Sequence, residues 1–176
     1  MLKLVSPSNK YKKSFLEAVE EYKKDKERGR YPATLNMEEM TEEKFNGYVK
    51  RKLDHSKGID IKEGRVPDTE YWLVDDDEFI GKISIRHYLN ENLRKLSGHI
   101  GYTVRPSKRK LGYGTKMLLL ALVEAKKLGI GKALITCDKT NIGSAKIIEK
   151  NGGILENEVA QDEGKPPRLR YWVEIK

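Results

Sequence analysis

Residues 99–128 read HIGYTVRPSKRKLGYGTKMLLLALVEAKKL and carry the strongest structural pattern in the chain. The first part, His99–Val104, alternates apolar with other residues between Gly98 and Pro106, which predicts a β-strand. The last part, Thr115–Leu128, predicts a helix with a broad buried face, because its apolar residues share adjacent helical stripes: Met117, Ala121, Ala125 and Leu128, with Leu118 and Leu122 beside them. The basic, glycine-rich sequence between this strand and this helix is the first candidate site.

That connecting sequence is RKLGYG, residues 109–114. A helix that begins at such a turn presents unpaired backbone N–H groups and the positive end of its dipole. Gly112 and Gly114 have no side chain to block an approaching ligand. The turn therefore predicts a site for an anionic, phosphorylated ligand. The alternative is that the two glycines only allow a tight turn.

Two common phosphate-binding motifs do not fit this turn. A P-loop requires Gly, four residues and then Gly-Lys-Ser/Thr, and no window of the sequence supplies it. A dinucleotide-binding fingerprint requires a third glycine where this chain has Met117. A different class of phosphorylated ligand is therefore favoured.

Size and composition favour one soluble, globular domain over residues 1–176, with 38% hydrophobic and 35% charged residues. The longest apolar run, Met117–Val123, is far shorter than the about 18 residues that cross a bilayer, so no membrane association is expected. No apolar leader follows Met1, and Cys137 is the one cysteine. Both features predict a reducing, cytoplasmic location.

The chain has 35 Lys and Arg against 27 Asp and Glu, a formal charge of +8. This excess could serve nucleic acid, an anionic ligand or solubility alone. Before Lys62 most basic residues alternate with acidic ones, as in EEYKKD at 20–25, which is typical of a solvated helix face. We therefore expect no nucleic-acid partner, and salt-sensitive binding to nucleic acid would contradict this.

The remaining sequence predicts a mixed α/β sheet with helices on its faces. In the N-terminal third, Leu2–Val5 resembles an edge strand, a helix is expected from Ser8 or Asn9 to near Gly29, and a second covers Thr41–Ser56 after a capping box at 36–39. The later expected elements are a hairpin of Glu70–Val74 and Phe79–Tyr88, a buried strand Ala133–Cys137, a short helix opened by 138–141 and stopped by 151–153, and strands Ile154–Val159 and Leu169–Ile175. The segment 90–98 is expected to be a polar loop.

Arg109–Gly114 matches Gln/Arg-x-x-Gly-x-Gly/Ala, with Gly-Tyr-x-Val-x-Pro before it and Asn141-x-x-Ser144 after it. In this combination the chain resembles the Gcn5-related N-acetyltransferase (GNAT) family over roughly 70–159. The resemblance implies a mostly antiparallel central sheet, splayed at one strand pair, with helices on both faces. It also implies acetyl-CoA as acyl donor and no metal.

The resemblance places the cofactor along the opening stretch. The pyrophosphate is expected on the backbone N–H groups of Leu111, Gly112, Tyr113, Gly114 and Thr115. Arg109 and Lys110 are expected to add positive charge, with Lys108 reaching the 3′-phosphate.

The backbone of Tyr102, Thr103 and Val104 is expected to pair with the pantetheine arm as a neighbouring strand would. Asn141 and Ser144 match positions that contact the pantetheine or phosphate region. The alternatives are a helix cap for Asn141 and an exposed polar residue for Ser144.

Acetyl transfer requires a neutral amine, a donor for the oxyanion and release of a thiolate. A backbone N–H near Tyr102 is expected to meet the oxyanion. His99 stands where many family members carry a catalytic glutamate, two residues before Gly101, and is the candidate general base. The alternative for His99 is a strand histidine that faces solvent or bonds to a loop carbonyl.

The chain departs from the family pattern where a tyrosine often protonates the thiolate, because it has Ile148 there and Gly153 where Phe is usual. A thiol with a pKa near 8.5 leaves without much assistance, so catalysis is still expected. Cys137 could substitute as the acid or belong to the core.

The predicted function is transfer of an acetyl group from acetyl-CoA to an amine, by direct attack in a ternary complex. The alternative is a non-catalytic acyl-CoA-binding module. The acceptor is expected to be a small-molecule or peptide amine, and a homodimer is possible.

Overall fold

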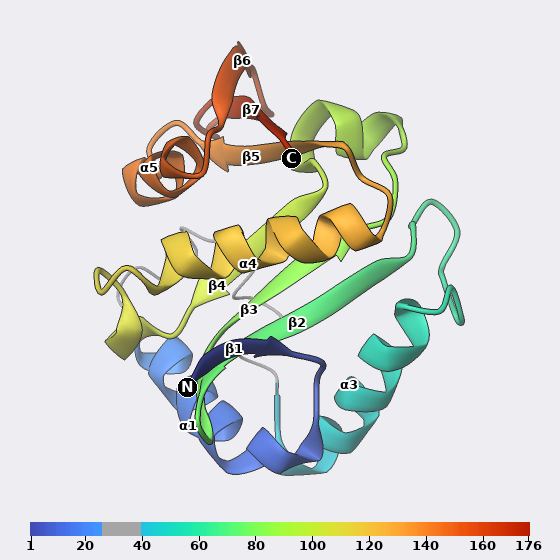
Figure 1. Ribbon diagram of the computed structural model, residues 1–176, viewed down its shortest axis with the longest axis vertical. Helices are drawn as coiled ribbons and strands as arrows, with labels where there is room; N and C mark the ends of the chain where they lie inside the picture. Colours follow the sequence, from blue (N-terminus) through green and yellow to red (C-terminus); the bar gives the residue numbers. More distant parts are fainter. Residues whose placement is uncertain (26–39) are drawn as a thin grey trace.

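A computed structural model describes residues 1–25 and 40–176. Its centre is a seven-stranded sheet with the order β1-β2-β3-β4-β5-β7-β6 (Figure 1). The strands are β1 (Leu2–Val5), β2 (Asp68–Asp75), β3 (Glu78–Arg86), β4 (Ile100–Val104), β5 (Lys132–Asp138), β6 (Ile154–Val159) and β7 (Arg168–Glu174).

Neighbouring strands in this order are antiparallel except at the centre, where β4 and β5 run parallel. This parallel pair is joined in register at one position, Ile100 opposite Ile135. Beyond Ile100 the two strands separate, whereas β4 stays paired with β3 as far as Val104. The predicted sheet, with its splay at one strand pair, is confirmed.

Helices cover both faces of the sheet because successive strand residues point to opposite sides. On one face α4 (Tyr113–Lys127) and α5 (Ile142–Lys150) pack over Leu73 and its neighbours, and α4 crosses in front of the strands in Figure 1. On the other face α1 (Lys12–Lys24) and α3 (Glu42–His55) enclose an aromatic core around Trp72. The open end of the splay lies at the start of α4.

The N-terminal helices differ in detail from the sequence prediction. Ser8 caps a 3₁₀ turn, Asn9–Tyr11, rather than α1 itself. The helix then ends at Lys24, because Asp25 adopts an extended conformation; Gly29 and the predicted capping box at 36–39 lie outside the described residues. Thr41 caps α3 by accepting a hydrogen bond from the Lys44 N–H.

The polar segment before β4 also contains more structure than a loop. A π-helical turn covers Leu93–Ser97, and Gly98 closes it with a φ of 65°. A Cβ on Gly98 would lie 2.4 Å from the Leu134 carbonyl oxygen, so glycine is required where the chain crosses β5.

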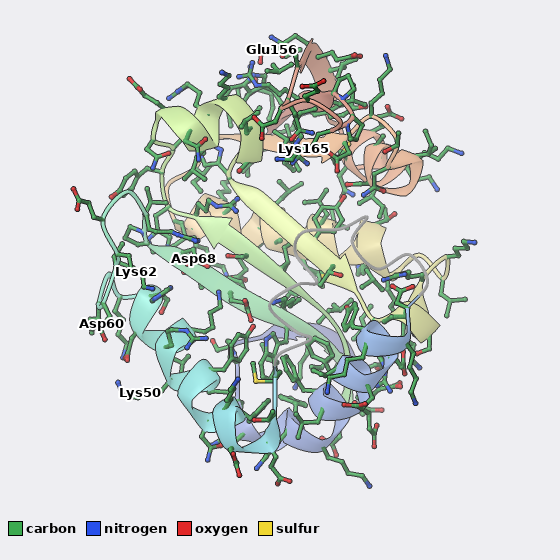
Figure 2. All side chains as sticks on the ribbon, turned by 180° about the vertical axis from the view of Figure 1, so that it is seen from behind. Lys50, Asp60, Lys62, Asp68, Glu156 and Lys165 are labelled. Carbon is green, nitrogen blue, oxygen red and sulfur yellow. The ribbon has the colours of Figure 1, made fainter. Side chains whose placement is uncertain are left out.

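Charged side chains are buried between α3 and the sheet. Lys52 of α3 lies 3.2 Å from the carboxylate of Glu70, which is 3% exposed. Glu70 also accepts hydrogen bonds from Tyr48 and Trp72. Figure 2 shows Asp68 on the inner side of α3 and Lys50 on the outer side. The Asp68 carboxylate lies 3.7 Å from the Lys52 ammonium. This cluster fastens α3 to β2.

Candidate functional site

The turn before α4 has the geometry of an anion-binding loop. Gly112, the residue that precedes the helix, has a φ of 84°, and Lys110 has a φ of 64°. Left-handed residues in such a turn orient successive N–H groups toward one point. Within the described chain, residues 110–115 donate no backbone hydrogen bond, and the first helical donor is the N–H of Lys116, bonded to the Gly112 carbonyl. The six N–H groups of residues 110–115 therefore have no backbone acceptor within the described chain.

Gly114 has a separate role in this turn. A Cβ there would lie 2.6 Å from Cδ1 of Ile147 on α5. The glycine therefore lets the first turn of α4 approach α5 closely, while Gly112 supplies the left-handed backbone. The two positions of the motif therefore meet different requirements, a left-handed backbone at Gly112 and close helix packing at Gly114.

Two of the three basic side chains beside the turn bind within the protein. Arg109 forms an ion pair with Asp25 at 2.7 Å and donates from Nε to the Val104 carbonyl at 3.3 Å. Lys108 forms an ion pair with Glu78 at 2.8 Å. Lys110 is exposed beside the unpaired N–H groups. Lys108 is thus held toward Glu78 at the start of β3, and its predicted contact with a 3′-phosphate stays a prediction.

The edge of β4 that faces β5 is open along the splay. The register of β3 with β4, with the hydrogen bonds from Arg86 to the His99 carbonyl and from Arg105 to the Ile80 carbonyl, shows that the backbone groups of Gly101 and Thr103 face β3. The backbone N–H and C=O of Tyr102 and the N–H of Val104 therefore face the splay. Because pairing with β5 ends at Ile100, an extended ligand can bond to this edge as a strand would.

A cavity of about 310 Å³ lies in the splay. Its lining comes from the π-turn, β3, β4, β5, the start of α5 and the start of β7: Arg86, Leu96, Ser97, Ile100, Gly101, Tyr102, Thr136, Cys137, Asp138, Asn141, Ser144 and Arg168. The structure thus brings Tyr102, Asn141 and Ser144 to one cavity, and their predicted contact with a cofactor stays a prediction. It adds Arg168, which forms an ion pair with Asp138 at 3.2 Å and has no sequence signal linking it to the site.

Asn141 and Ser144 are tied to the start of α5. The Asn141 side chain accepts a hydrogen bond from the Ser144 N–H at 3.0 Å, so Asn141 caps the helix. The Ser144 hydroxyl lies 2.8 Å from the Tyr102 hydroxyl across the splay. The pairing of Tyr102 with Ser144 was missed by sequence reasoning, since the two residues are 42 positions apart.

Ile148 and Gly153, the two departures from the family pattern, lie in direct contact. Ile148 is fully buried in the core beneath α5. A Cβ on Gly153 would lie 2.4 Å from Cγ2 and 2.9 Å from the carbonyl oxygen of Ile148. The residue after Gly152 must therefore be glycine where β6 turns back over the end of α5. Cys137 lies in the cavity wall, and burial raises the pKa of its thiol to about 11.

His99 is buried where β4 and β5 meet, and its ring does not face solvent. Its backbone N–H donates to the Leu134 carbonyl at 2.7 Å, and its Nδ1 accepts from the Leu134 N–H at 2.9 Å. Burial, with the nearby charges of Arg94 and Arg86, lowers the pKa of His99 to about 4. An Nδ1 that accepts this bond leaves the proton on Nε2. The geometry therefore counts against His99 as general base and in favour of a role in joining the strands.

Within residues 1–25 and 40–176, no three acidic, histidine or cysteine side chains gather as a metal site. In the same residues, no helix combines the length and apolar character that crossing a membrane requires.

Comparison with known proteins agrees with this geometry. The family model described as the acetyltransferase (GNAT) domain matches residues 10–154. A search of curated proteins gave no match. Among solved structures, a ribosomal L7/L12 alpha-N-protein acetyltransferase in complex with coenzyme A is similar, with 19% identity, a TM-score of 0.73, and coverage of 99% of this chain and 94% of that chain.

Two further structures show the same fold. The microcin C7 self-immunity acetyltransferase, in complex with acetyl-CoA and AMP, has 15% identity and a TM-score of 0.72 over 99% of this chain and 92% of its own. The Salmonella typhimurium acetyltransferase that modifies the N-terminal serine of ribosomal protein L7/L12 has 19% identity and a TM-score of 0.69, over 99% and 95% of the two chains.

Proposed function

Because the chain belongs to the GNAT acetyltransferase family, we propose that it moves an acetyl group from acetyl-CoA to an amine by direct attack in a ternary complex. The observation that carries the proposal is the open edge of β4, which leads from the unpaired N–H groups before α4 to the cavity of the splay. This path provides anion donors at one end and backbone donors at the other, as an acyl-CoA requires.

The residues of the site suit both the pyrophosphate and the pantetheine arm of acetyl-CoA, the acyl donor. The N–H groups of residues 110–115 suit the pyrophosphate, with Lys110 adding charge. Tyr102 and Val104 suit the pantetheine amides, and the Tyr102 N–H is the proposed oxyanion donor, where charge develops on the thioester oxygen. Asn141 and Ser144 close the other wall of the splay.

The proposed acceptor is the α-amino group of a peptide or protein. The Nδ1 of His99 accepts a hydrogen bond from the Leu134 N–H, so we do not propose His99 as the base. The amine must therefore enter the site in its neutral form. An α-amine with a pKa near 7.8 is neutral roughly 300-fold more often at pH 7 than a lysine amine with a pKa near 10.4. Two structurally similar proteins are an α-N-protein acetyltransferase and an acetyltransferase that modifies an N-terminal serine, which supports this choice.

The test is an assay for free thiol with acetyl-CoA and a panel of matched peptides. One peptide has a free N-terminus and no lysine, a second has an acetylated N-terminus and one lysine, and a third has both amines blocked. We expect thiol release with the first peptide, far less with the second, and none above hydrolysis with the third.

Two results decide against parts of the proposal. Binding of acetyl-CoA without thiol release from any amine would identify the alternative, a non-catalytic acyl-CoA-binding module. Preference for the lysine peptide would overturn the α-amine assignment and reopen the search for a base. A homodimer and a cytoplasmic location stay predictions, and light scattering measures the first.

A further inference from the structure

Two arginines line the cavity of the splay from the face of the sheet that is opposite α4. Ile85 and Leu169 pack with the core beneath α4 and α5. Because successive strand residues point to opposite faces, the adjacent side chains of Arg86 and Arg168 point to the other face, and both line the cavity. The proposed pyrophosphate site lies at the start of α4. The acceptor therefore has the side of the cavity that carries the arginines.

Arg86 is a half-buried cation. Its Nη1 donates to the carbonyl oxygens of Gly98 at 2.9 Å and Ser97 at 3.3 Å. Within residues 1–25 and 40–176 no carboxylate forms an ion pair with it, because the neighbouring Asp68 bonds instead to Ser84. Burial lowers the pKa of Arg86. Since a guanidinium has five N–H donors, Arg86 keeps donors for an anion.

Arg168 also has a donor to spare. Its Nη1 forms an ion pair with Asp138 at 3.2 Å, and its Nη2 donates to Gln161 at 3.4 Å. Its Nε is buried and has no hydrogen-bond partner in the described part of the chain, whereas buried N–H groups ordinarily have one. The cavity lining holds Arg86 and Arg168 against the single carboxylate of Asp138, so it carries a positive charge.

We propose that Arg86 and Arg168 bind a carboxylate of the acceptor, so that the preferred acceptor carries an acidic group within a few bonds of the amine that is acetylated. The inference rests on the proposed function and names its substrate class. A carboxylate can accept from two N–H groups of one guanidinium. In a peptide the carboxylate belongs to an acidic side chain at the first or second position, and in a free amino acid it is the α-carboxylate.

The competing explanation is that the two arginines only fasten elements together. Arg86 would hold the π-turn against β3, and Arg168 would hold β7 against β5. A purely structural role would affect all acceptors alike. The two explanations therefore differ in the ratio of kcat/KM between an acidic acceptor and its uncharged amide.

The experiment measures thiol release from acetyl-CoA by the full chain with three matched pairs of acceptors. The pairs are peptides that begin with Asp or Asn, peptides that begin with Ala followed by Asp or Asn, and free alanine with alaninamide. All rates are expressed per neutral amine. In at least one pair we expect kcat/KM to be at least about 10-fold higher for the acid, which corresponds to about 1.4 kcal/mol. The pair that shows the preference identifies the source of the carboxylate.

Two variants remove the arginines from the cavity. Arg86→Gln removes the cation that has no carboxylate partner in the described residues. Arg168→Gln is combined with Asp138→Asn, so that the ion pair is removed as a unit and no carboxylate is left without its partner. Each variant should lose most of the preference, chiefly through a higher KM for the acidic acceptor.

Arg170→Gln is the matched control. Arg170 lies on the same strand and face as Arg168, forms an ion pair with Glu156 at 3.0 Å, and also has a buried Nε without a partner in the described chain. It does not line the cavity. This variant should keep the preference for the acid.

The outcomes are distinct. No thiol release with any acceptor overturns the proposed function, and this inference with it. Release with equal kcat/KM for acid and amide in all three pairs overturns the inference alone. A preference that both cavity variants retain, or that Arg170→Gln loses equally, also overturns it.

A measurement on the wild-type protein decides the question if the cavity variants do not fold. Peptides that begin with N-acetylated Asp or Asn cannot react and should compete with the acceptor. We expect the acid to inhibit more strongly than the amide, and equal inhibition by the two would count against the inference.

Discussion

At the scale of single residues, His99 shows how burial changes a role that the sequence suggests. Its position two residues before Gly101 predicts a base that faces a substrate. The ring instead accepts the Leu134 N–H at the point where β4 and β5 meet. Without it, the Leu134 N–H would be buried without a partner, which costs about 1–3 kcal/mol.

His99→Asn tests this role, because the amide oxygen can accept the Leu134 N–H and does not titrate. The pKa of His99 is lowered to about 4 from 6.5, so the neutral form is favoured in the folded state. Its contribution to stability is complete above pH 6.5 and is lost as pH falls toward 4. We expect denaturant unfolding to show similar stabilities at pH 7.5 and a growing advantage of the variant as the solution is acidified.

The activity of His99→Asn shows whether His99 acts instead as the general base. If His99 were the general base, His99→Asn would lower kcat/KM by about 10² or more at pH 7.5 while stability stayed constant. A small change in kcat/KM would agree with the strand-joining role.

Local residue patterns predicted features that depend on backbone conformation. They missed features that depend on contacts between residues far apart in the sequence. Gly112 was predictable, since a helix-starting turn of this kind requires a left-handed residue. Ile148 and Gly153 looked like departures from a family pattern, but they are one packing contact between α5 and the start of β6. The Tyr102–Ser144 bond joins residues from two elements, and no local pattern encodes it.

At the scale of elements, the start of α4 is the part of the fold from which we infer a phosphorylated ligand. Its helix and strand neighbours were predictable because their apolar periodicities are long and regular. The partners of its basic residues were not, since Asp25 and Glu78 come from α1 and β3. We therefore expect the N–H groups of residues 110–115, rather than the side chains of Arg109 or Lys108, to be the principal donors to an anion.

Gly112→Asp and Gly112→Asn test these donors as a matched pair. Both side chains tolerate a left-handed backbone and cap helices. The aspartate adds a negative charge that favours the helix and repels pyrophosphate. Calorimetry at low salt should show coenzyme A binding at least about 10-fold weaker for Asp than for Asn, with thermal stability of the Asp variant equal or higher. Equal affinities would place the phosphates elsewhere.

At the scale of the whole molecule, the two faces of the sheet are held differently. The face under α4 and α5 is apolar. The face under α1 and α3 combines an aromatic core with buried charges around Glu70. Burial raises the pKa of Glu70, but the charges of Lys82 and Lys52 and the bonds from Tyr48 and Trp72 outweigh it, so its pKa lies below its usual value.

Glu70→Gln should therefore destabilise the fold by about 3–5 kcal/mol at pH 7, because Lys52 and Lys82 lose their buried counter-charge. Lys82→Met is the comparison: it removes an ammonium group whose burial lowers its pKa, and it leaves Glu70 bonded to Lys52. We expect it to cost less than Glu70→Gln in urea unfolding. A larger cost for Lys82→Met would show that Lys82, not Lys52, is the partner on which Glu70 depends.

A crystal structure of the protein with acetyl-CoA would show whether the cofactor occupies the splay between β4 and β5. We expect the pyrophosphate on the N–H groups of residues 110–115, the pantetheine along Tyr102 and Val104, and the thioester in the cavity of the splay. Acetyl-CoA bound at another surface, with the open edge of β4 unoccupied, would contradict it.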